Sequence, residues 1–262
     1  GGQFNYAKQV PGKEEFYETL RYFDNQLARL GVTVHLNTQV NVENLSNKGF
    51  DEVVLATGIN PRTLTIEGHD HPKVMSYLDV LRDHKPVGKK VAIVGAGGIG
   101  FDVAEFLEEN EHLANDKEKW LAHWGLVKDY FAPGALKEKA IEPSEREVYL
   151  LQRKTSKVGK GLGKTTGWIH RQSLKHHNVQ MINGVGYEKV DDEGLHVLIN
   201  DTPKVLPVDN VIVCAGQEPF KPLQQPLEEA GFTVHIIGGA DVAAELDAKR
   251  AIRQGAELAA RI

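Results

Sequence analysis

Cysteine is nearly absent from this chain, and its scarcity limits the redox chemistry that these residues can perform alone. Cys214 is the only cysteine among the 262 residues. It cannot by itself form an internal disulfide, a CxxC redox pair or a cysteine-ligated iron–sulfur cluster. Because it lies in the apolar run VIVCAG, we expect a buried structural thiol.

Long apolar runs and basic runs are also lacking. No segment approaches the ~20 apolar residues that span a bilayer, and no lysine–arginine run with interleaved aromatics suggests a nucleic-acid surface. The net charge of -5 argues against a general polyanion binder. We therefore expect a cytoplasmic protein with neither a nucleic-acid nor a membrane partner.

The 11 histidines show no zinc motif of the HExxH type, so we expect no metal site. His69 and His71 flank Asp70 in a turn-rich segment, which we do not interpret as a site. His176 and His177 are adjacent and therefore cannot share one face of a helix.

The apolar pattern predicts an α/β fold in which helices cover parallel sheets. We expect helices over residues 13–30, 99–110, 168–176 and the last residues to 262, and strands over residues 32–36, 52–56, 90–94, 147–151, 179–182, 195–199, 208–214 and 233–237. The strand over 52–56 is apolar on both faces, which favours a central position. Residues 60–90 hold many turn formers and are the best linker candidate. The turn over 191–194 favours a hairpin between the strands on either side of it.

A glycine-rich turn stands between the strand VAIV and the helix FDVAEFL, in the run Gly95, Ala96, Gly97, Gly98, Ile99 and Gly100. This strand–turn–helix context is typical of a dinucleotide site. Gly95 permits the tight turn, Gly97 leaves room for a pyrophosphate, and Gly100 lets the helix pack close to the strand. The phosphates would face the positive amino-terminal end of the helix.

The end of the next strand indicates which nicotinamide cofactor is used. An acidic residue there would bind the ribose 2′-hydroxyl of NADH, but the strand VYLL is followed by Gln152, Arg153 and Lys154. A guanidinium at this position favours a 2′-phosphate and hence NADPH. This prediction requires that residues ~111–146 are a helical excursion, after which the sheet resumes.

Two other features on this side of the chain were weighed. The run GKGLGKT over residues 159–165 is one residue too short for a Walker A loop, so we interpret it as a basic loop near the dinucleotide phosphates. Asp102 and Glu105 follow the glycine turn, and we expect surface helix charges, although Glu105 could approach a nicotinamide.

Two segments outside this unit suggest a second nucleotide. Ala56-Thr57-Gly58 ends an apolar strand, and Gly238-Gly239-Ala240-Asp241 precedes the final helix. A carboxylate at such a strand end can accept hydrogen bonds from a ribityl or ribose hydroxyl. Taken alone, Asp241 could equally cap the helix, and Thr57 with Gly58 could form a simple turn.

In this order the segments resemble the two-dinucleotide-binding flavoprotein reductases, in which an NADPH domain is inserted into an FAD domain. The more specific resemblance is to the C-terminal part of bacterial 2,4-dienoyl-CoA reductases. It covers nearly the whole chain apart from residues ~107–146, and the segments that carry it are GGQFNYAKQVPGKEEFYETLRYF, SYLDVLRDHKPVGKKVAIVGAGGIGFD, LLQRKTSKVGKGLGKTTGWIHR, CAGQEP and ELDAKRAIRQG.

The resemblance implies a Rossmann-like NADPH-binding domain over residues 87–215, inserted into an incomplete FAD-binding Rossmann-like domain over residues 1–86 and 216–262. It places Gly2, Gln3, Thr57, Gly58 and Asp241 at FAD, and the glycine turn with Arg153 and Lys154 at NADPH. NADPH would reduce FAD, and electrons would pass through a 4Fe–4S cluster and FMN in an N-terminal TIM barrel to a 2,4-dienoyl-CoA, during breakdown of unsaturated fatty acids.

The chain departs from that family's full pattern in several ways. The barrel, the cluster cysteines and the first FAD strand with its own glycine motif are not among these residues, so we expect a C-terminal fragment that binds FAD poorly. No catalytic side chain is predicted, since hydride transfer needs the cofactors positioned rather than an acid. The alternatives are a related amine dehydrogenase-type flavoprotein and a non-catalytic nucleotide-binding module.

Overall fold

The computed structural model describes residues 1–108, 113, 116–129, 131–243 and 248–262. It divides into two compact units: unit 1 comprises residues 1–22 and 63–215, and unit 2 comprises residues 23–62 and 216–262. These limits differ from the predicted domain boundary at 86/87, because residues 63–86 supply a strand and a helix to unit 1. The assignment of FAD and NADPH to separate domains stays a prediction.

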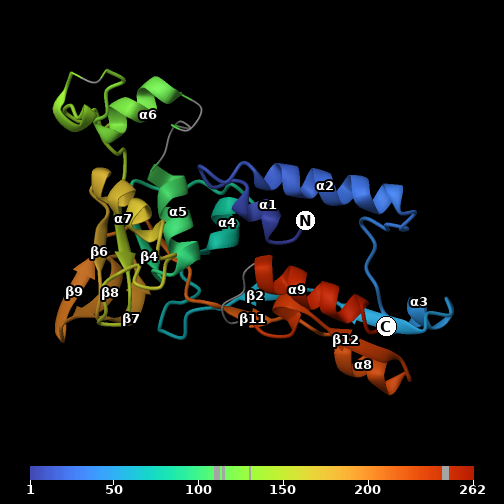
Figure 1. Ribbon diagram of the computed structural model, residues 1–262. Helices are drawn as coiled ribbons and strands as arrows, with labels where there is room; N and C mark the ends of the chain where they lie inside the picture. The colour runs from blue at the N-terminus through green and yellow to red at the C-terminus, as the bar shows by residue number, and fades with distance from the viewer. Residues whose placement is uncertain (109–112, 114–115, 130, 244–247) are drawn as a thin grey trace. The chain divides into compact units, whose positions relative to one another are not determined.

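Unit 1 contains most of the regular structure (Figure 1). Its helices are α1 (Phe4–Ala7), α4 (Tyr77–Leu81), α5 (Gly98–Glu108), α6 (Lys117–Trp124) and α7 (Gly167–His176), with a 3-10 turn at Pro133–Ala135; α2 (Phe16–Arg29) begins in unit 1 and ends in unit 2. Its strands are β3 (Val74–Ser76), β4 (Lys90–Val94), β5 (Glu147–Leu151), β6 (Gln180–Ile182), β7 (Val185–Asp191), β8 (Gly194–Ile199), β9 (Thr202–Leu206) and β10 (Asn210–Val213).

Five of these strands form a parallel sheet in the order β3-β10-β4-β5-β6. β4 and β5 are direct neighbours, with Val94 opposite Leu151, although the excursion separates them in the sequence. The sheet therefore resumes after the excursion, as predicted. A second, antiparallel sheet has the order β7-β8-β9.

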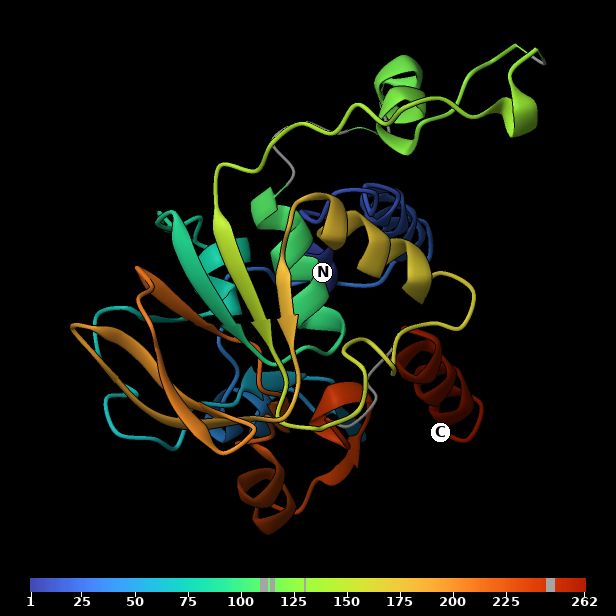
Figure 2. The same cartoon turned by 90° about the vertical axis from the view of Figure 1, so that its left-hand side faces the viewer.

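Alternation along the parallel strands explains the three layers of unit 1. Val91 and Ile93 of β4 belong to the core cluster that includes residues of α4, α5 and α7. Ala92 and Val94 belong to the other cluster, with residues of β7, β8 and β9. Since successive strand residues point to opposite faces, the parallel sheet lies between a helical layer and the antiparallel sheet (Figure 2). The predicted α/β fold is confirmed.

Unit 2 is smaller. Its helices are α3 (Val42–Ser46), α8 (Gln224–Glu229) and α9 (Ala248–Ala259), with a 3-10 turn at Gly238–Ala240, and its strands are β1 (Glu52–Leu55), β2 (Ile59–Pro61), β11 (Gln217–Pro219) and β12 (Thr233–Ile236). β1 pairs with β12 in parallel, and β2 pairs with β11 antiparallel.

Several local expectations were wrong. Residues 32–36 form no strand and are exposed, because no described strand lies beside them. β1 has one neighbour among the described strands and is half exposed, so it is not central here. The turn after Asp191 joins β8 to β7, a strand that we missed, and not to β6. The supposed linker contains β3, which extends the parallel sheet.

Within the part of the chain that the structure describes, none of the helices has the length and apolar content of a membrane span.

Candidate functional site

The glycine turn between β4 and α5 is shaped by two close backbone contacts. Gly95 has a φ of +111°, and a Cβ there would lie 2.4 Å from the carbonyl oxygen of Cys214. A Cβ on Gly100 would lie 1.8 Å from the carbonyl oxygen of Gly95. Neither position accepts a side chain without movement of the backbone, so the turn and the start of α5 are held against each other.

The middle of the turn is open by contrast. A Cβ on Gly97 or Gly98 would meet no atom within 4 Å, and both residues are exposed. α5 begins at Gly98, and its first amides have no partner inside the helix. The turn therefore presents exposed amides and the positive end of a helix dipole to whatever lies above it, which is the arrangement that binds phosphate.

The basic strand end lies beside this turn, because β5 is the neighbour of β4. The Gln152 amide nitrogen Nε2 donates to the carbonyl oxygens of Lys154, at 2.9 Å, and Ser156, at 2.7 Å. These bonds hold the loop that carries Arg153 and Lys154, while both basic side chains stay exposed.

A cavity of about 700 Å³ joins the turn to the basic loop. Among the described residues none of its lining side chains is a carboxylate; the lining comprises Val94, Gly95, Ala96, Gly97, Gln152, Arg153, Lys154, Ser156, Lys160, Gly161, Tyr187, Cys214 and Ala215. The structure thus brings the glycine turn, the predicted cations and the basic loop over 159–165 to one place. The three cations of this lining, Arg153, Lys154 and Lys160, favour an anion there.

Cys214 lies at the floor of this cavity as a buried thiol. Burial raises the pKa of this thiol well above its usual range. A buried, protonated thiol is a poor nucleophile, which agrees with the structural function expected from the sequence.

The residues predicted at FAD are divided between the units. Gly2 and Gln3 precede α1 in unit 1, where Gly2 has a φ of +50°. Thr57, Gly58 and Asp241 belong to unit 2.

In unit 2, local contacts hold the predicted FAD residues. The Thr57 hydroxyl donates to the carbonyl oxygen of Phe220. The Asp241 carboxylate accepts a hydrogen bond of 2.8 Å from Gln254 of α9. Asp241 is exposed and follows the 3-10 turn, and because Val242 and Ala243 after it are not helical, Asp241 does not directly precede a helix as an N-cap would.

The acidic side chains of α5 are not the solvated surface charges that we expected. Glu105 is buried, and its carboxylate lies 2.7 Å from Nδ1 of His170 on α7. Asp102 forms an ion pair of 2.6 Å with Lys13. These groups join α5 to its neighbours within unit 1 rather than forming a solvated helix face, and Glu105 does not line the dinucleotide cavity.

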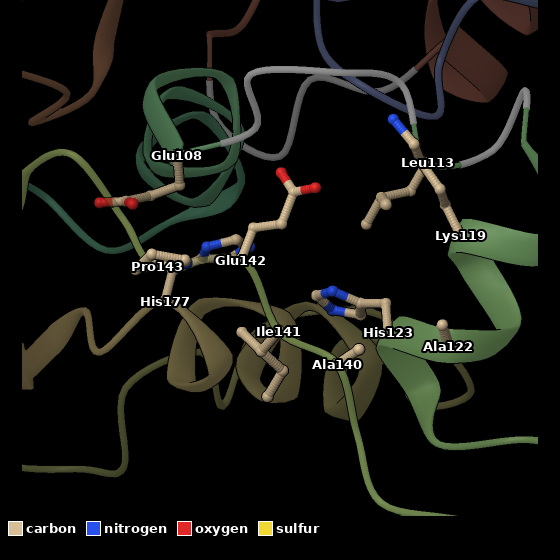
Figure 3. A pocket seen from close by; sticks show the side chains of 10 residues that line it. All are labelled: Glu108, Leu113, Lys119, Ala122, His123, Ala140, Ile141, Glu142, Pro143 and His177. Atoms are coloured by element: carbon tan, nitrogen blue, oxygen red, sulfur yellow. The ribbon is translucent and has the colours of Figure 1, made fainter.

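A histidine cluster that we did not predict lies between α6 and α7. His123, His176 and His177 are all buried, and the first two rings are 4.9 Å apart. α7 ends at His176, so His177 leaves the helix and its ring reaches within 5.9 Å of His123. His176 and His177 therefore both belong to this cluster, although as neighbours in the sequence they cannot share one face of a helix. His123 and His177 line a cavity of about 320 Å³ (Figure 3).

The contacts of His176 determine which of its ring nitrogens donates a hydrogen bond and which accepts one. Its Nε2 lies 3.0 Å from Nζ of Lys139, and its Nδ1 lies 3.0 Å from Nε2 of His123. An ammonium only donates, so His176 accepts at Nε2 and donates from Nδ1 to His123. A metal-binding imidazole normally donates its second N–H to an oxygen. Because an ammonium occupies that position, we interpret Lys139, His176 and His123 as a hydrogen-bonded chain, beside which the His177 ring lies with no hydrogen-bond partner among the described residues.

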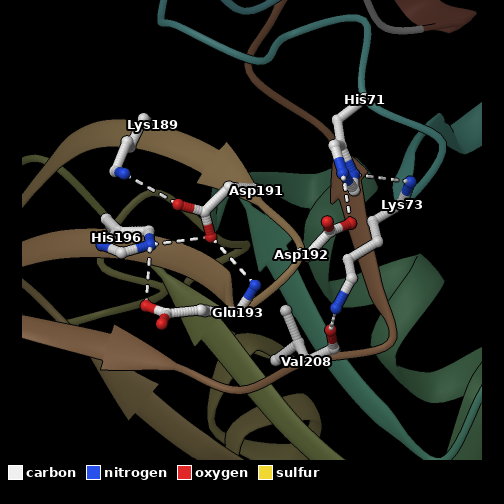
Figure 4. Close-up of polar contacts among 8 residues, drawn as sticks. All are labelled: His71, Lys73, Lys189, Asp191, Asp192, Glu193, His196 and Val208. Carbon is white, nitrogen blue, oxygen red and sulfur yellow. Dashed lines mark hydrogen bonds and ion pairs between the residues drawn. The ribbon is translucent and has the colours of Figure 1, made fainter.

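The candidate metal ligands lie elsewhere. Within the described ranges, the one group of three candidate ligand atoms within 4.8 Å belongs to Asp191, Glu193 and His196, at the β7–β8 turn. Lys189 already binds Asp191 at 2.7 Å, and it holds the pKa of that carboxyl well below its usual range, with His196 adding to the effect. Figure 4 shows that these side chains are engaged with one another. We assign them to stabilisation of the turn.

A comparison with known protein families identifies the family to which the chain belongs. The family described as pyridine nucleotide-disulphide oxidoreductase matches residues 22–250. The match covers most of the chain, which therefore belongs to this family of flavoprotein oxidoreductases, and membership implies binding of FAD and NAD(P)H.

Two curated relatives are reductases. A metal reductase from Desulforamulus reducens is 29% identical over 244 residues, covering 92% of this chain and 36% of that protein. A cinnamate reductase from Clostridium sporogenes is 44% identical over 105 residues, covering 38% of this chain and 16% of that protein. The chain thus matches at most about a third of the length of these relatives.

Solved structures share the fold. A 2-naphthoyl-CoA reductase, solved with 2-naphthoyl-CoA, superposes with a TM-score of 0.79 at 22% identity, over 100% of this chain and 34% of that one. A histamine dehydrogenase from Rhizobium sp. 4-9 superposes with a TM-score of 0.71 at 17% identity, over 98% and 38%.

The histidine cluster predicts that acid destabilises unit 1. Burial, the Lys139 ammonium and the two other imidazoles lower the pKa of His176 to about 4, and burial also lowers the pKa of His123 and His177. The unfolded chain therefore binds more protons below pH 6.5. We expect the free energy of unfolding to fall by about 2 kcal/mol from pH 6.5 to pH 4.5 through His176. Glu105 raises the pKa of His170, whose contribution changes in the opposite direction, being lost as pH rises.

Urea unfolding followed by tryptophan fluorescence measures this effect, since all three tryptophans lie in unit 1. His176→Gln removes the titrating group but keeps a side chain that can hydrogen-bond, and it should flatten the dependence on pH. His69→Gln, at an exposed histidine, is the matched control. An unchanged slope in His176→Gln would contradict the assignment.

Proposed function

We propose that this chain is the electron-input part of an NADPH-dependent flavoprotein oxidoreductase. The observation that carries the proposal is the cavity that joins the Gly95–Gly100 turn to Arg153 and Lys154, with no carboxylate among its described lining residues. The exposed amides of the turn would bind the pyrophosphate, and the basic loop would bind the 2′-phosphate. When bound, NADPH supplies a hydride that reduces FAD.

The protein's own contribution would be to bind and orient. Gly97 leaves the pyrophosphate access to the backbone, and α5 directs its positive end toward that charge. Arg153 and Lys154 would hold the adenosine end, so that the nicotinamide extends away from them. Gly2, Gln3, Thr57, Gly58 and Asp241 are proposed to line FAD, on the strength of the family resemblance.

We further propose that electrons continue to an N-terminal barrel of a longer chain, through a 4Fe–4S cluster and FMN, to a 2,4-dienoyl-CoA. The resemblance of long segments to bacterial 2,4-dienoyl-CoA reductases supports this substrate. The 2-naphthoyl-CoA reductase that shares this fold was solved with a CoA thioester, and this also supports a CoA-thioester substrate. An amine dehydrogenase-type protein is the second candidate, since a histamine dehydrogenase also shares the fold; ADP binding without reduction by NADPH would favour it.

Arg153→Gln tests the choice of cofactor. Removal of one charged hydrogen-bonding partner of the 2′-phosphate should weaken NADPH binding by about 10-fold or more and leave NADH binding unchanged. Isothermal titration calorimetry of the purified chain with each cofactor measures both values. Lys204→Gln, at an exposed lysine on β9 outside the cavity, is the control. Equal affinity of the unsubstituted chain for NADH and NADPH would refute the 2′-phosphate site.

Two glycine substitutions separate binding from folding. Gly97→Ala adds a methyl group where the structure has open space, so stability should change by less than about 0.5 kcal/mol while dinucleotide binding is lost. Gly100→Ala places a methyl group against the Gly95 carbonyl, and it should cost about 1–3 kcal/mol of stability. Thermal unfolding and NADPH titration of both variants provide the measurement. If Gly97→Ala binds NADPH normally, the pyrophosphate does not lie at this turn.

A further inference from the structure

Tyr187 of β7 is the one aromatic side chain among the described residues that line the dinucleotide cavity. Its ring packs against the core cluster between the two sheets of unit 1. The pairing of β7 with β8 shifts register between Tyr187 and Lys189, which marks a β-bulge directly after the tyrosine. Bulges commonly change the direction of a side chain beside a binding site.

The hydroxyl of Tyr187 is a buried polar atom with no hydrogen-bond partner among the described residues. An unsatisfied buried hydroxyl destabilises the fold, so its position calls for an acceptor supplied from outside the chain. Burial raises the pKa of Tyr187 well above its usual range, which keeps the hydroxyl protonated and able to donate.

The Arg153 guanidinium opposes the effect of burial on the pKa of Tyr187. Both residues line the same cavity, together with Lys154 and Lys160. An anion bound by the Arg153 guanidinium would therefore lie in the cavity that the half-buried Tyr187 also lines, and it would reach the hydroxyl once the side chains that cover this oxygen move aside. Such an anion would supply the missing acceptor.

We propose that the Tyr187 hydroxyl donates a hydrogen bond to the phosphate that Arg153 binds, and that Tyr187 is thereby a specificity-determining residue for 2′-phosphorylated adenosine. This inference rests on the proposed NADPH function. Tyr187 adds a neutral, directional donor to a site whose other phosphate-binding side chains are exposed cations. A hydroxyl that stays unsatisfied without the phosphate favours the phosphorylated ligand over its unphosphorylated analogue.

Tyr187→Phe removes the oxygen atom and leaves the ring in place. Isothermal titration calorimetry with 2′,5′-ADP should show a dissociation constant raised about 10-fold, the usual effect of losing a hydrogen bond to a charged group. The dissociation constant of 5′-ADP, which lacks the 2′-phosphate, should change less than about twofold. The melting temperature of the ligand-free variant should equal or exceed that of the unsubstituted chain, since a buried unpaired hydroxyl has been removed.

Tyr149→Phe is the matched control, because its hydroxyl bonds to Glu147 outside the cavity. Unchanged 2′,5′-ADP binding in Tyr187→Phe, or an equal loss for both ligands, overturns the proposal while leaving the NADPH function intact. If the unsubstituted chain binds 2′,5′-ADP no more tightly than 5′-ADP, the NADPH function fails and the Tyr187 proposal fails with it.

Discussion

The close approach of α5 to the end of β4 is the constraint on which the candidate site depends. The carbonyl oxygen of Gly95 would lie 1.8 Å from a Cβ on Gly100, so only glycine permits this contact. The approach brings the first turn of α5 onto the sheet edge where β4, β5 and β10 end together. Most of the remaining cavity lining continues from the strands of that edge: the basic loop follows β5, and Cys214 and Ala215 follow β10, while Tyr187 comes from β7 of the second sheet.

The features most accurately predicted from the sequence are those that local rules determine. The glycine turn, β4 and β5 are readable because strand, turn and helix each have a short-range signature. The pairing of β4 with β5 was predictable only by assuming an excursion, since roughly fifty residues separate the two strands. The structure confirms this assumption, and so the cations of the β5 loop lie beside the glycines.

The errors occurred where tertiary context decides. Residues 32–36 have the composition of a strand but no described strand to pair with, and an isolated strand is not stable. From the sequence alone Glu105 is indistinguishable from a surface charge, but in the fold α7 brings His170 against its carboxylate. Tyr187 gave no signal in the sequence, because its strand was missed and its relevance comes only from a cavity formed by three other segments. The functions assigned to the individual site residues stay predictions.

The excursion is compatible with the site because its carboxyl end is fixed at the end of α5 that lies opposite the glycine turn. Arg146, just before β5, donates a hydrogen bond of 2.7 Å to the carbonyl oxygen of Leu107, and Ser144 donates to the carboxylate of Glu108. A cation at the carboxyl end of a helix also complements the helix dipole. The 11 residues of α5 separate this anchor from the glycine turn by about 16 Å. The inserted segment is therefore anchored at the opposite end of α5 from the amides that would bind the cofactor.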